Sequence, residues 1–316
     1  IREFGPNNLK NSSLCFGTMQ FGDGANEKDS QEMYEACRDR GINFFDTAFV
    51  YTGGKSEVIL SNLIKEERDK IILITKAGSV GGSSSKNIIS QLEESLKRLK
   101  QDYVDVFFLH HWDANVPLEE TFETLQKLRE EGKFFQLGAS NFSSWQVMKA
   151  QQVAEKNGFP SVDILQPMYN IVKRQAEVEI LPMSQTENIG VISYSPLGGG
   201  LLTGKYSSVD SSNKNSLGRL HDNSKYKKRY GQNWMYDAAN SLVSLANDLD
   251  YDPIALAVAW VSYNDAITAP IISARNLKQL KPSLDSVEIS LDQETYNLIS
   301  NISPTPPPAT DRLEEV

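Results

Sequence analysis

Short apolar runs alternate along the chain with longer segments whose hydrophobic residues recur at helical spacing. The short runs are rich in Val, Ile, Leu and Phe, which is typical of buried strands. They predict eight strands, at residues 14–17, 43–47, 71–75, 104–109, 136–139, 164–166, 191–194 and 269–272. Strands that alternate with helices in this way indicate a parallel sheet with crossover helices.

Two of the intervening segments carry clear helix signals. Residues 84–100 have an apolar stripe formed by Ile88, Ile89, Leu92, Leu96 and Leu99. A second helix is expected to begin with Pro117 in its first turn and to end at Gly132. Eight strand–helix units in 316 residues fit a closed barrel better than an open doubly wound sheet. We therefore predict an α/β fold, a (β/α)8 TIM-type barrel, with residues 1–316 forming a single domain.

Two stretches interrupt the alternation. Residues 198–234, after the seventh strand, are rich in Ser, Asn, Lys and Arg and show neither a strand nor a helix pattern. A long connection without regular structure is typical of a binding loop or lid, so we expect a cofactor or substrate loop there, although the composition also fits a flexible surface excursion. The C-terminal tail, residues 303–316, contains Pro304 and three consecutive prolines, and we expect it to lie over the surface without forming a helix.

Composition narrows the classes of partner. The 41 acidic side chains outnumber the 32 basic ones, which gives a net charge of −9 and a pI of about 5.0. Such a protein is a poor candidate for binding nucleic acid or an anionic membrane surface as its main partner. The longest apolar run, residues 255–261, is far too short to span a membrane.

Cysteine content and the first residues bear on the compartment. Because Cys15 and Cys37 are the only cysteines, we expect no disulfide framework and interpret both as small core residues in a reducing, cytoplasmic environment. No secretory signal opens the sequence. Since Ile1 rather than Met comes first, the sequence leaves open whether the native chain extends further upstream.

Four ionisable side chains follow the carboxyl ends of consecutive predicted strands: Asp46, Tyr51, Lys76 and His110. In a barrel these ends meet at one rim, where ligands bind. Burying a Lys and an Asp is costly unless they pair, so separate structural roles explain the set poorly. A lysine ammonium lowers the pKa of a nearby phenol from its usual value of about 10, and an imidazole can orient a substrate oxygen. The set therefore indicates proton donation by Tyr51.

Six segments, in this order, resemble the aldo-keto reductase family: GINFFDTAFVYTGGKSEVIL, ILITKAG, DYVDVFFLHHWD, GASNF, LQPMYN and GVISYSPLGGGLLTGKY. The similarity covers almost the whole chain. It implies a barrel that binds NADP(H) without a Rossmann motif and reduces an aldehyde, ketone or sugar carbonyl, or oxidises the matching alcohol. It also implies that Tyr51 is the general acid, tuned by Lys76 and Asp46, while His110 helps to orient the carbonyl.

The resemblance further implies a set of cofactor-binding residues. They are Ser140, Asn141 and Gln166 for the nicotinamide carboxamide, Tyr194 for ring stacking, Ser195, Pro196, Leu197, Gly198, Gly200, Leu202, Gly204 and Lys205 over the pyrophosphate, and Ser273, Arg275 and Gln279 at the adenosine end. The glycines allow backbone N–H groups to approach a phosphate closely, and Arg275 suits a 2′-phosphate. Ser61, Ser273 and Ser283 replace residues that are usual in the family. The last two leave open whether NADPH or NADH is preferred.

The substrate pocket is less well defined by the sequence. Its candidate walls are Met19, Phe21, Phe49 and Trp112, which would combine apolar bulk with few polar groups, and parts of the long loop around Arg219 to Trp234. We expect His111 to point away from His110, because neighbours in a strand alternate faces, and we assign it no catalytic role. The identity of the carbonyl or alcohol substrate, the physiological direction and the oligomeric state stay open.

Two other functions are compatible with parts of the sequence. The family resemblance extends to potassium-channel β subunits, so a nucleotide-binding regulatory subunit with little or no turnover is the main alternative. A glycoside hydrolase would use paired carboxylates such as Asp46 and Asp113, but it leaves Lys76 without a role. No metal-ligand spacing appears, and no metal is expected.

Overall fold

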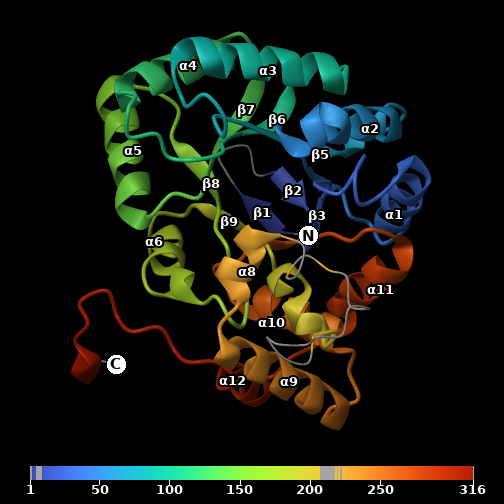
Figure 1. Ribbon diagram of the computed structural model, residues 1–316. Coiled ribbons are helices and arrows are strands. Elements are labelled where there is room, and N and C mark those ends of the chain that lie inside the picture. The colour runs from blue at the N-terminus through green and yellow to red at the C-terminus, as the bar shows by residue number, and fades with distance from the viewer. Residues whose placement is uncertain (1, 5–8, 207–217, 219, 221–222, 316) are drawn as a thin grey trace.

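The computed structural model describes residues 2–4, 9–206, 218, 220 and 223–315 (Figure 1). Parallel strands form a closed barrel in the order β10-β3-β4-β5-β6-β7-β8-β9. They are β3 (Cys15–Gly17), β4 (Phe44–Asp46), β5 (Ile72–Ala77), β6 (Val104–Leu109), β7 (Phe134–Ser140), β8 (Val162–Gln166), β9 (Gly190–Ser193) and β10 (Ala269–Ile272). Each overlaps one of the predicted strands, and the predicted barrel is confirmed.

Alternation along the strands fills the barrel interior. A buried cluster inside it contains Phe44 of β4, Ile74 of β5 and Ile164 of β8. Side chains two residues apart on a strand share a face, so the next inward positions are Asp46, Lys76 and Gln166. These three polar side chains continue the apolar interior at the carboxyl ends of their strands. The residues between them, such as Thr75, face the surrounding helices.

Helices surround the barrel (Figure 1). They are α1 (Glu27–Asp39), α2 (Lys55–Ile64), α3 (Ser85–Leu99), α4 (Leu118–Glu130), α5 (Ser144–Asn157), α6 (Ile180–Thr186), α8 (Ser224–Tyr230), α9 (Asn233–Asp248), α10 (Pro253–Tyr263), α11 (Leu277–Asp285) and α12 (Gln293–Ser300). The helices expected at residues 84–100 and after Pro117 are confirmed as α3 and α4. No helix in the described part of the chain is long and apolar enough to cross a membrane.

The insertion at residues 198–234 is more ordered than its composition indicates. Its described parts include a 3-10 segment, η4 (Gly198–Thr203), and helix α8, so the expectation of a stretch without regular structure is wrong there. Asn223 starts α8 by accepting hydrogen bonds from the backbone N–H groups of Lys225 and Tyr226. Tyr230, at the end of the helix, is fully buried and anchors it.

A hairpin that was not predicted closes the amino end of the barrel. Strands β1 (Arg2–Phe4) and β2 (Leu9–Asn11) pair antiparallel. Leu9 packs against the interior apolar cluster. Asn43, just before β4, accepts a hydrogen bond from the N–H of Ser12 at 2.8 Å and donates one to the carbonyl of Lys10 at 2.9 Å. The carboxyl end of the barrel is left as the place for a site.

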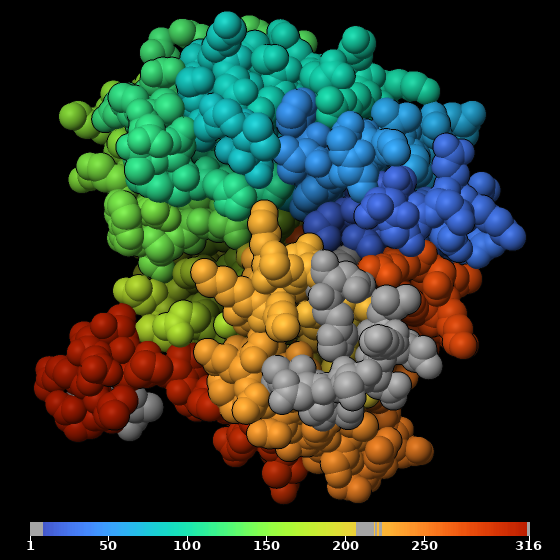
Figure 2. Space-filling view, in the orientation of Figure 1, coloured from blue at the N-terminus to red at the C-terminus, as the bar shows by residue number. Residues whose placement is uncertain are grey.

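The cysteines lie where the sequence predicts, but the C-terminal tail does not. Cys15 and Cys37 are both buried and free, as expected of core residues. Residues 304–308 have no helix, as their prolines predict. The tail does not lie over the surface as expected. It leaves the main body and ends in a short 3-10 turn, η6 (Leu313–Glu315), visible as the red extension in Figure 2.

Candidate active site

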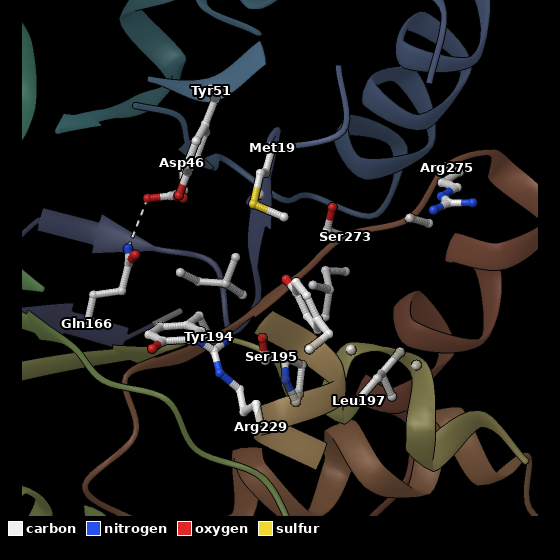
Figure 3. A pocket seen from close by; sticks show the side chains of 18 of the residues that line it. Met19, Asp46, Tyr51, Gln166, Tyr194, Ser195, Leu197, Arg229, Ser273 and Arg275 are labelled. Carbon is white, nitrogen blue, oxygen red and sulfur yellow. Dashed lines mark hydrogen bonds between the residues drawn. The ribbon is translucent and has the colours of Figure 1, made fainter. Parts of the chain in front are cut away.

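A cavity of about 610 Å³ lies at the carboxyl ends of the strands (Figure 3). It is lined by most of the residues proposed from the sequence: Met19, Asp46, Tyr51, His110, Ser140, Asn141, Gln166, Tyr194, Ser195, Pro196, Leu197, Gly200, Lys205, Ser273, Arg275 and Gln279. The fold therefore brings together residues separated by up to 260 positions in the sequence, from Met19 to Gln279. Their alignment at one rim follows from the parallel barrel.

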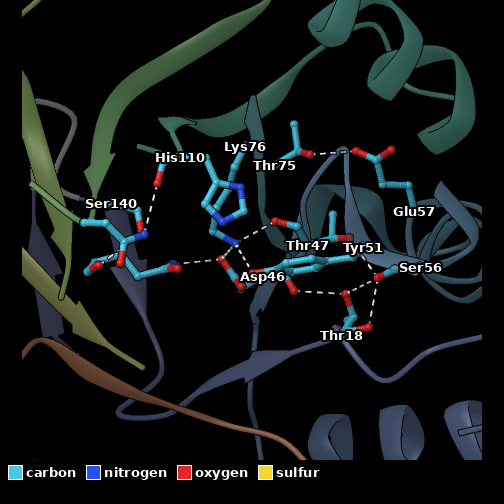
Figure 4. Close-up of polar contacts among 12 residues, drawn as sticks. Thr18, Asp46, Thr47, Tyr51, Ser56, Glu57, Thr75, Lys76, His110 and Ser140 are labelled. Carbon is cyan, nitrogen blue, oxygen red and sulfur yellow. Dashed lines mark hydrogen bonds and ion pairs between the residues drawn. The ribbon is translucent and has the colours of Figure 1, made fainter. Parts of the chain in front are cut away.

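Lys76 is the centre of the buried polar contacts (Figure 4). Its ammonium lies 2.6 Å from Asp46 Oδ1 and donates hydrogen bonds to the Tyr51 hydroxyl at 3.1 Å and to the Thr47 carbonyl at 2.8 Å. The side chains of Lys76 and Asp46 are 0% and 4% exposed. Gln166 Nε2 donates to the same Asp46 oxygen at 2.9 Å. Each buried charge is thus compensated, as the cost of desolvation requires.

The environment keeps the Tyr51 hydroxyl protonated. Burial raises its pKa, Lys76 acts to lower it and Asp46 to raise it, and the net result lies above the usual value. The influence of Lys76 has the expected direction, but burial outweighs it. For Lys76, burial lowers the pKa, while Asp46 and Tyr51 raise it by more, so the ammonium stays charged. A neutral phenol beside a fixed ammonium is a proton donor whose conjugate base has a stabilising partner.

His110 follows β6 and faces Tyr51 edge-on, with ring centroids 6.0 Å apart and an interplanar angle of 82°. Burial, with contributions from Lys76 and His111, lowers the pKa of His110 to about 3. The ring is therefore neutral at physiological pH. Its Nδ1 atom is buried and has no hydrogen-bond partner among the described residues. The residue itself lines the cavity, where a neutral imidazole can orient a ligand oxygen.

His111 does not point away from His110, contrary to expectation. The two rings stack, with centroids 5.0 Å apart and an angle of 12°. Strand β6 ends at Leu109, so the alternation of faces does not extend to these residues. His111 thereby becomes part of the cavity wall.

At one part of the cavity, amide and hydroxyl groups form a connected cluster. The Tyr194 hydroxyl donates to Asn141 Oδ1 at 2.9 Å, and Asn141 Nδ2 donates to the His110 carbonyl at 3.0 Å and lies 3.0 Å from the hydroxyl of Ser140. The Ser140 hydroxyl donates to the carbonyl of Gln166 at 3.1 Å. Side chains from the ends of β7 and β9, with the Gln166 backbone carbonyl at the end of β8, thus form one connected cluster.

Another part of the cavity suits an anionic ligand. Gly198, Gly199 and Gly200 all have positive φ values. A Cβ atom on Gly199 would lie 2.6 Å from the Tyr226 ring, so only glycine fits there. Lys205, Arg275 and the hydroxyl of Ser273 lie at the same cavity, and that hydroxyl is buried without a partner among the described residues. Cations, compact glycine backbone and an orphan donor fit the phosphates of a dinucleotide.

Three of the proposed loop residues lie beside the cavity rather than along it. Gly198, Leu202 and Gly204 do not line it. Leu202 is fully buried in the core, and Gly204 packs against Val243. They shape the turn that carries their neighbours.

The proposed substrate walls are only partly brought together. Met19 lines the cavity, but Phe21, Phe49 and Trp112 do not. The ring of Phe21 is buried against Phe16, with centroids 5.7 Å apart, and Phe49 lies under the guanidinium of Arg98 at 4.6 Å. Trp112 packs edge-on against Phe142 and Trp145, with centroids 5.4 Å away in both cases. Tertiary contacts thus direct all three aromatic rings elsewhere.

Several lining residues were missed in the sequence. They are Gly17, His111, Thr203, Ile254, Ile271, Ile272 and Ala274. Tyr226 and Arg229 of α8 also line the cavity, as expected of the loop around Arg219 to Trp234, and Figure 3 labels Arg229 there. Their spacing of three residues after a capping Asn223 is a helix signal that could have identified this face.

Asp113 does not form a carboxylate pair with Asp46. Its carboxylate accepts hydrogen bonds from the N–H groups of Ser83 at 2.8 Å and Asn115 at 2.9 Å, which lower its pKa. It fixes a loop and does not line the cavity, so the geometry does not support a glycoside hydrolase. Within the described ranges, no group of three or more His, Cys, Asp or Glu side chains could hold a metal ion.

The sequence is similar to known proteins over almost its whole length. Residues 13–304 match the model of the Aldo/keto reductase family. The chain is 33% identical to an uncharacterized oxidoreductase of Bacillus subtilis, with 96% of this chain and 95% of that protein covered. It is 35% identical to human aflatoxin B1 aldehyde reductase member 2 (86% and 80% covered) and 32% identical to a probable voltage-gated potassium channel subunit beta of Arabidopsis thaliana (91% of each).

Proposed function

Because the chain belongs to the aldo/keto reductase family, we propose that it is an NADP(H)-dependent oxidoreductase. It reduces an aldehyde, ketone or sugar carbonyl, or oxidises the matching alcohol. The observation that carries the proposal is the contact of the Tyr51 hydroxyl with the Lys76 ammonium, 3.1 Å apart, at the edge of the cavity. Similarity to named oxidoreductases is a second support.

In this proposal the side chains around Tyr51 supply the proton that the carbonyl oxygen gains. Tyr51 donates its hydroxyl proton to the carbonyl oxygen, and the Lys76 ammonium stabilises the resulting phenolate. Asp46, held by Gln166, keeps the ammonium charged and in place. Neutral His110 orients the carbonyl oxygen without competing as an acid.

The remaining lining residues hold the nicotinamide cofactor, which supplies the hydride when bound. Ser140, Asn141 and Gln166, which line the cavity, bind the carboxamide in this proposal, and the Tyr194 ring provides a stacking face. Lys205 and Arg275 provide the positive charge that phosphates require.

The test follows NADPH consumption over a panel of aldehydes, ketones and sugars, with Tyr51→Phe beside the wild type. We expect the variant to lose turnover by at least about a hundredfold, because general acid catalysis contributes about that much or more. NADPH binding, followed by fluorescence, should be retained, since the aromatic ring is kept. Turnover that survives in the variant would contradict the role of Tyr51.

A regulatory subunit is the second candidate. It is favoured by the 32% identity to the probable potassium channel subunit beta of Arabidopsis thaliana. NADPH binding without turnover of any compound in the panel would favour this candidate over the reductase.

A further inference from the structure

Tyr51 is carried by an unusual segment between β4 and α2. Thr52, Gly53 and Gly54 follow it with φ values of 49°, 65° and 93°, all in the left-handed region. Three consecutive residues of this kind do not form a self-supporting helix or strand. The position of the hydroxyl therefore depends on contacts made from outside the segment.

Arg98 of α3 supplies contacts on both sides of Tyr51. Its Nη1 donates to the carbonyl of Phe49 at 2.9 Å, and its guanidinium lies 4.6 Å from the centre of the Phe49 ring. It also packs so closely on Gly54 that a Cβ atom there would lie 2.6 Å from its central carbon. The guanidinium thus clamps the segment two residues before and three residues after the phenol.

A fully buried carboxylate holds the guanidinium. Glu57, with a side-chain exposure of 0%, accepts a hydrogen bond from Arg98 Nη1 at 3.2 Å. Its other oxygen accepts one from the hydroxyl of Thr75 at 2.7 Å, which is visible in Figure 4. Thr75 precedes Lys76 on β5 and faces outward. The network therefore joins the segment that carries the phenol to the strand that carries the ammonium.

We propose that Arg98 is a positioning residue that holds the Tyr51 hydroxyl against Lys76, with Glu57 and Thr75 fixing its guanidinium. Arg98 does not line the cavity, so it acts through the segment and not on a ligand. Its planar fork serves a carbonyl and two carboxylates at once, because Nε also donates to Glu94 at 3.0 Å. Lysine cannot reproduce this set. The inference rests on the proposed function, since it concerns the delivery of the Tyr51 proton.

Loss of the clamp has a consequence beyond stability. The groups that face Tyr51 are Asp46 from β4, Lys76 from β5, His110 after β6 and Tyr226 from α8. Lys76 is the one that lowers the pKa of the phenol, so a hydroxyl that drifts away from it has a higher pKa. Alcohol oxidation needs the phenolate, and its rate should then rise only at higher pH.

The experiment compares Arg98→Lys with a matched control, Arg38→Lys. Arg38 of α1 forks onto Glu67 with two contacts of 2.9 Å and donates to the carbonyl of Ile42 at 2.7 Å. Its side chain is 20% exposed, like that of Arg98, and it serves the amino end of β4 instead of the carboxyl end. Measurements are kcat and KM for the carbonyl, the Kd of NADPH, the melting temperature, and the pH profile of alcohol oxidation.

We expect Arg98→Lys to lower kcat about tenfold or more, since small displacements of a reacting group cost that much. KM and the Kd of NADPH should change by less than about threefold, and the oxidation profile should shift to higher pH. Arg38→Lys should lower the melting temperature as much as Arg98→Lys does, but it should leave kcat and the pH profile of alcohol oxidation unchanged. Thr75→Val is the second variant, for use if Arg98→Lys fails to fold. It removes one hydrogen bond to Glu57 with little change in side-chain shape. We expect a smaller shift of the oxidation profile to higher pH.

An unchanged kcat and pH profile in Arg98→Lys, or equal losses in Arg38→Lys, would overturn the inference. The proposed function would still stand if the wild type turns over and Tyr51→Phe does not. A wild type without turnover would overturn the proposed function and this inference together.

Discussion

Tyr51 and His110 contact each other edge-on at the cavity, with ring centroids 6.0 Å apart, and burial keeps both of them uncharged. The same burial that raises the pKa of the phenol lowers the pKa of the imidazole to about 3. Neutral Tyr51 can give a proton, and neutral His110 has no extra proton to compete with it. Desolvation thus supports the division of roles proposed for the two rings, while Lys76 acts with burial on His110 and against burial on Tyr51.

The pH dependence of reduction tests the state of His110. Since its pKa lies near 3, the ring does not gain a proton as the pH falls from 8 to 5. We expect no inflection in kcat near the usual imidazole pKa of about 6.5. Profiles of the wild type and His110→Gln should have the same shape. An inflection that the wild type has and the variant lacks would contradict the neutral assignment.

Replacing Lys76 separates the chemistry from binding. Lys76→Met removes the ammonium that stabilises the phenolate, and it leaves Asp46 buried without its partner. We expect a loss of turnover far larger than the loss of NADPH affinity, alongside a destabilisation of about 3–5 kcal/mol. Single-turnover rates and fluorescence titration of NADPH measure the two effects. Equal losses of both would mean that Lys76 is structural.

At the scale of elements, two-residue periodicity accounts for what could be predicted from the sequence. Each strand shows its apolar pattern directly, and the polar residue that continues it, such as Lys76 after Ile74, must share the inward face. Strands β1 and β2 were not predicted because each contains a single apolar residue, whereas the equally short β3 and β4 lie in apolar runs. Phe49 lies in a loop, where no periodicity predicts the orientation of a side chain. Its ring is held instead by the guanidinium of Arg98.

A half-buried acid outside the site, Asp163, lies where β7 pairs with β8. The register shifts between Leu137 and Gly138, and the Leu137 N–H donates to Asp163 Oδ2 at 3.0 Å. Burial nevertheless raises the pKa of Asp163 to about 6, above its usual value. The folded state therefore binds this proton more tightly than the unfolded chain, and stability is lost as the pH rises through that range.

We expect Asp163→Asn to stabilise the protein at pH 8 by about 1–2 kcal/mol and to have no effect near pH 4. The amide oxygen can still accept the Leu137 hydrogen bond, while the half-buried charge is removed. Denaturant unfolding at the two pH values measures the difference. Asp113→Asn is the control with the opposite sign, because backbone hydrogen bonds lower the pKa of Asp113. A gain that is the same at both pH values would contradict this account.

On the scale of the whole molecule, charge is distributed unevenly. The chain has a net charge of −9, yet Lys205, Arg229 and Arg275 line the cavity. The carboxylate in that lining, Asp46, is neutralised by Lys76. An acidic protein with a cationic cavity repels anions generally and attracts them at one place.

This arrangement leads to an expected cofactor preference. Arg275→Gln should weaken NADPH binding about tenfold and NADH binding by less than about twofold, because a guanidinium contact to a phosphate is worth more than about 1.4 kcal/mol. Affinity for NADPH should also fall with added salt. Fluorescence titration of both nucleotides measures the effect. Equal losses for the two would place Arg275 away from the 2′-phosphate.

The β1–β2 hairpin determines from which end of the barrel Tyr51 can regain a proton. Leu9 seals the amino end, and the interior is packed with side chains such as Ile74 and Phe108, so water does not travel along the barrel axis. In a reductase of this design, water and substrate share the cavity mouth as their passage and must use it in turn. If Tyr51 donates its proton as proposed, the replacement proton would enter through the same cavity mouth that the alcohol uses to leave.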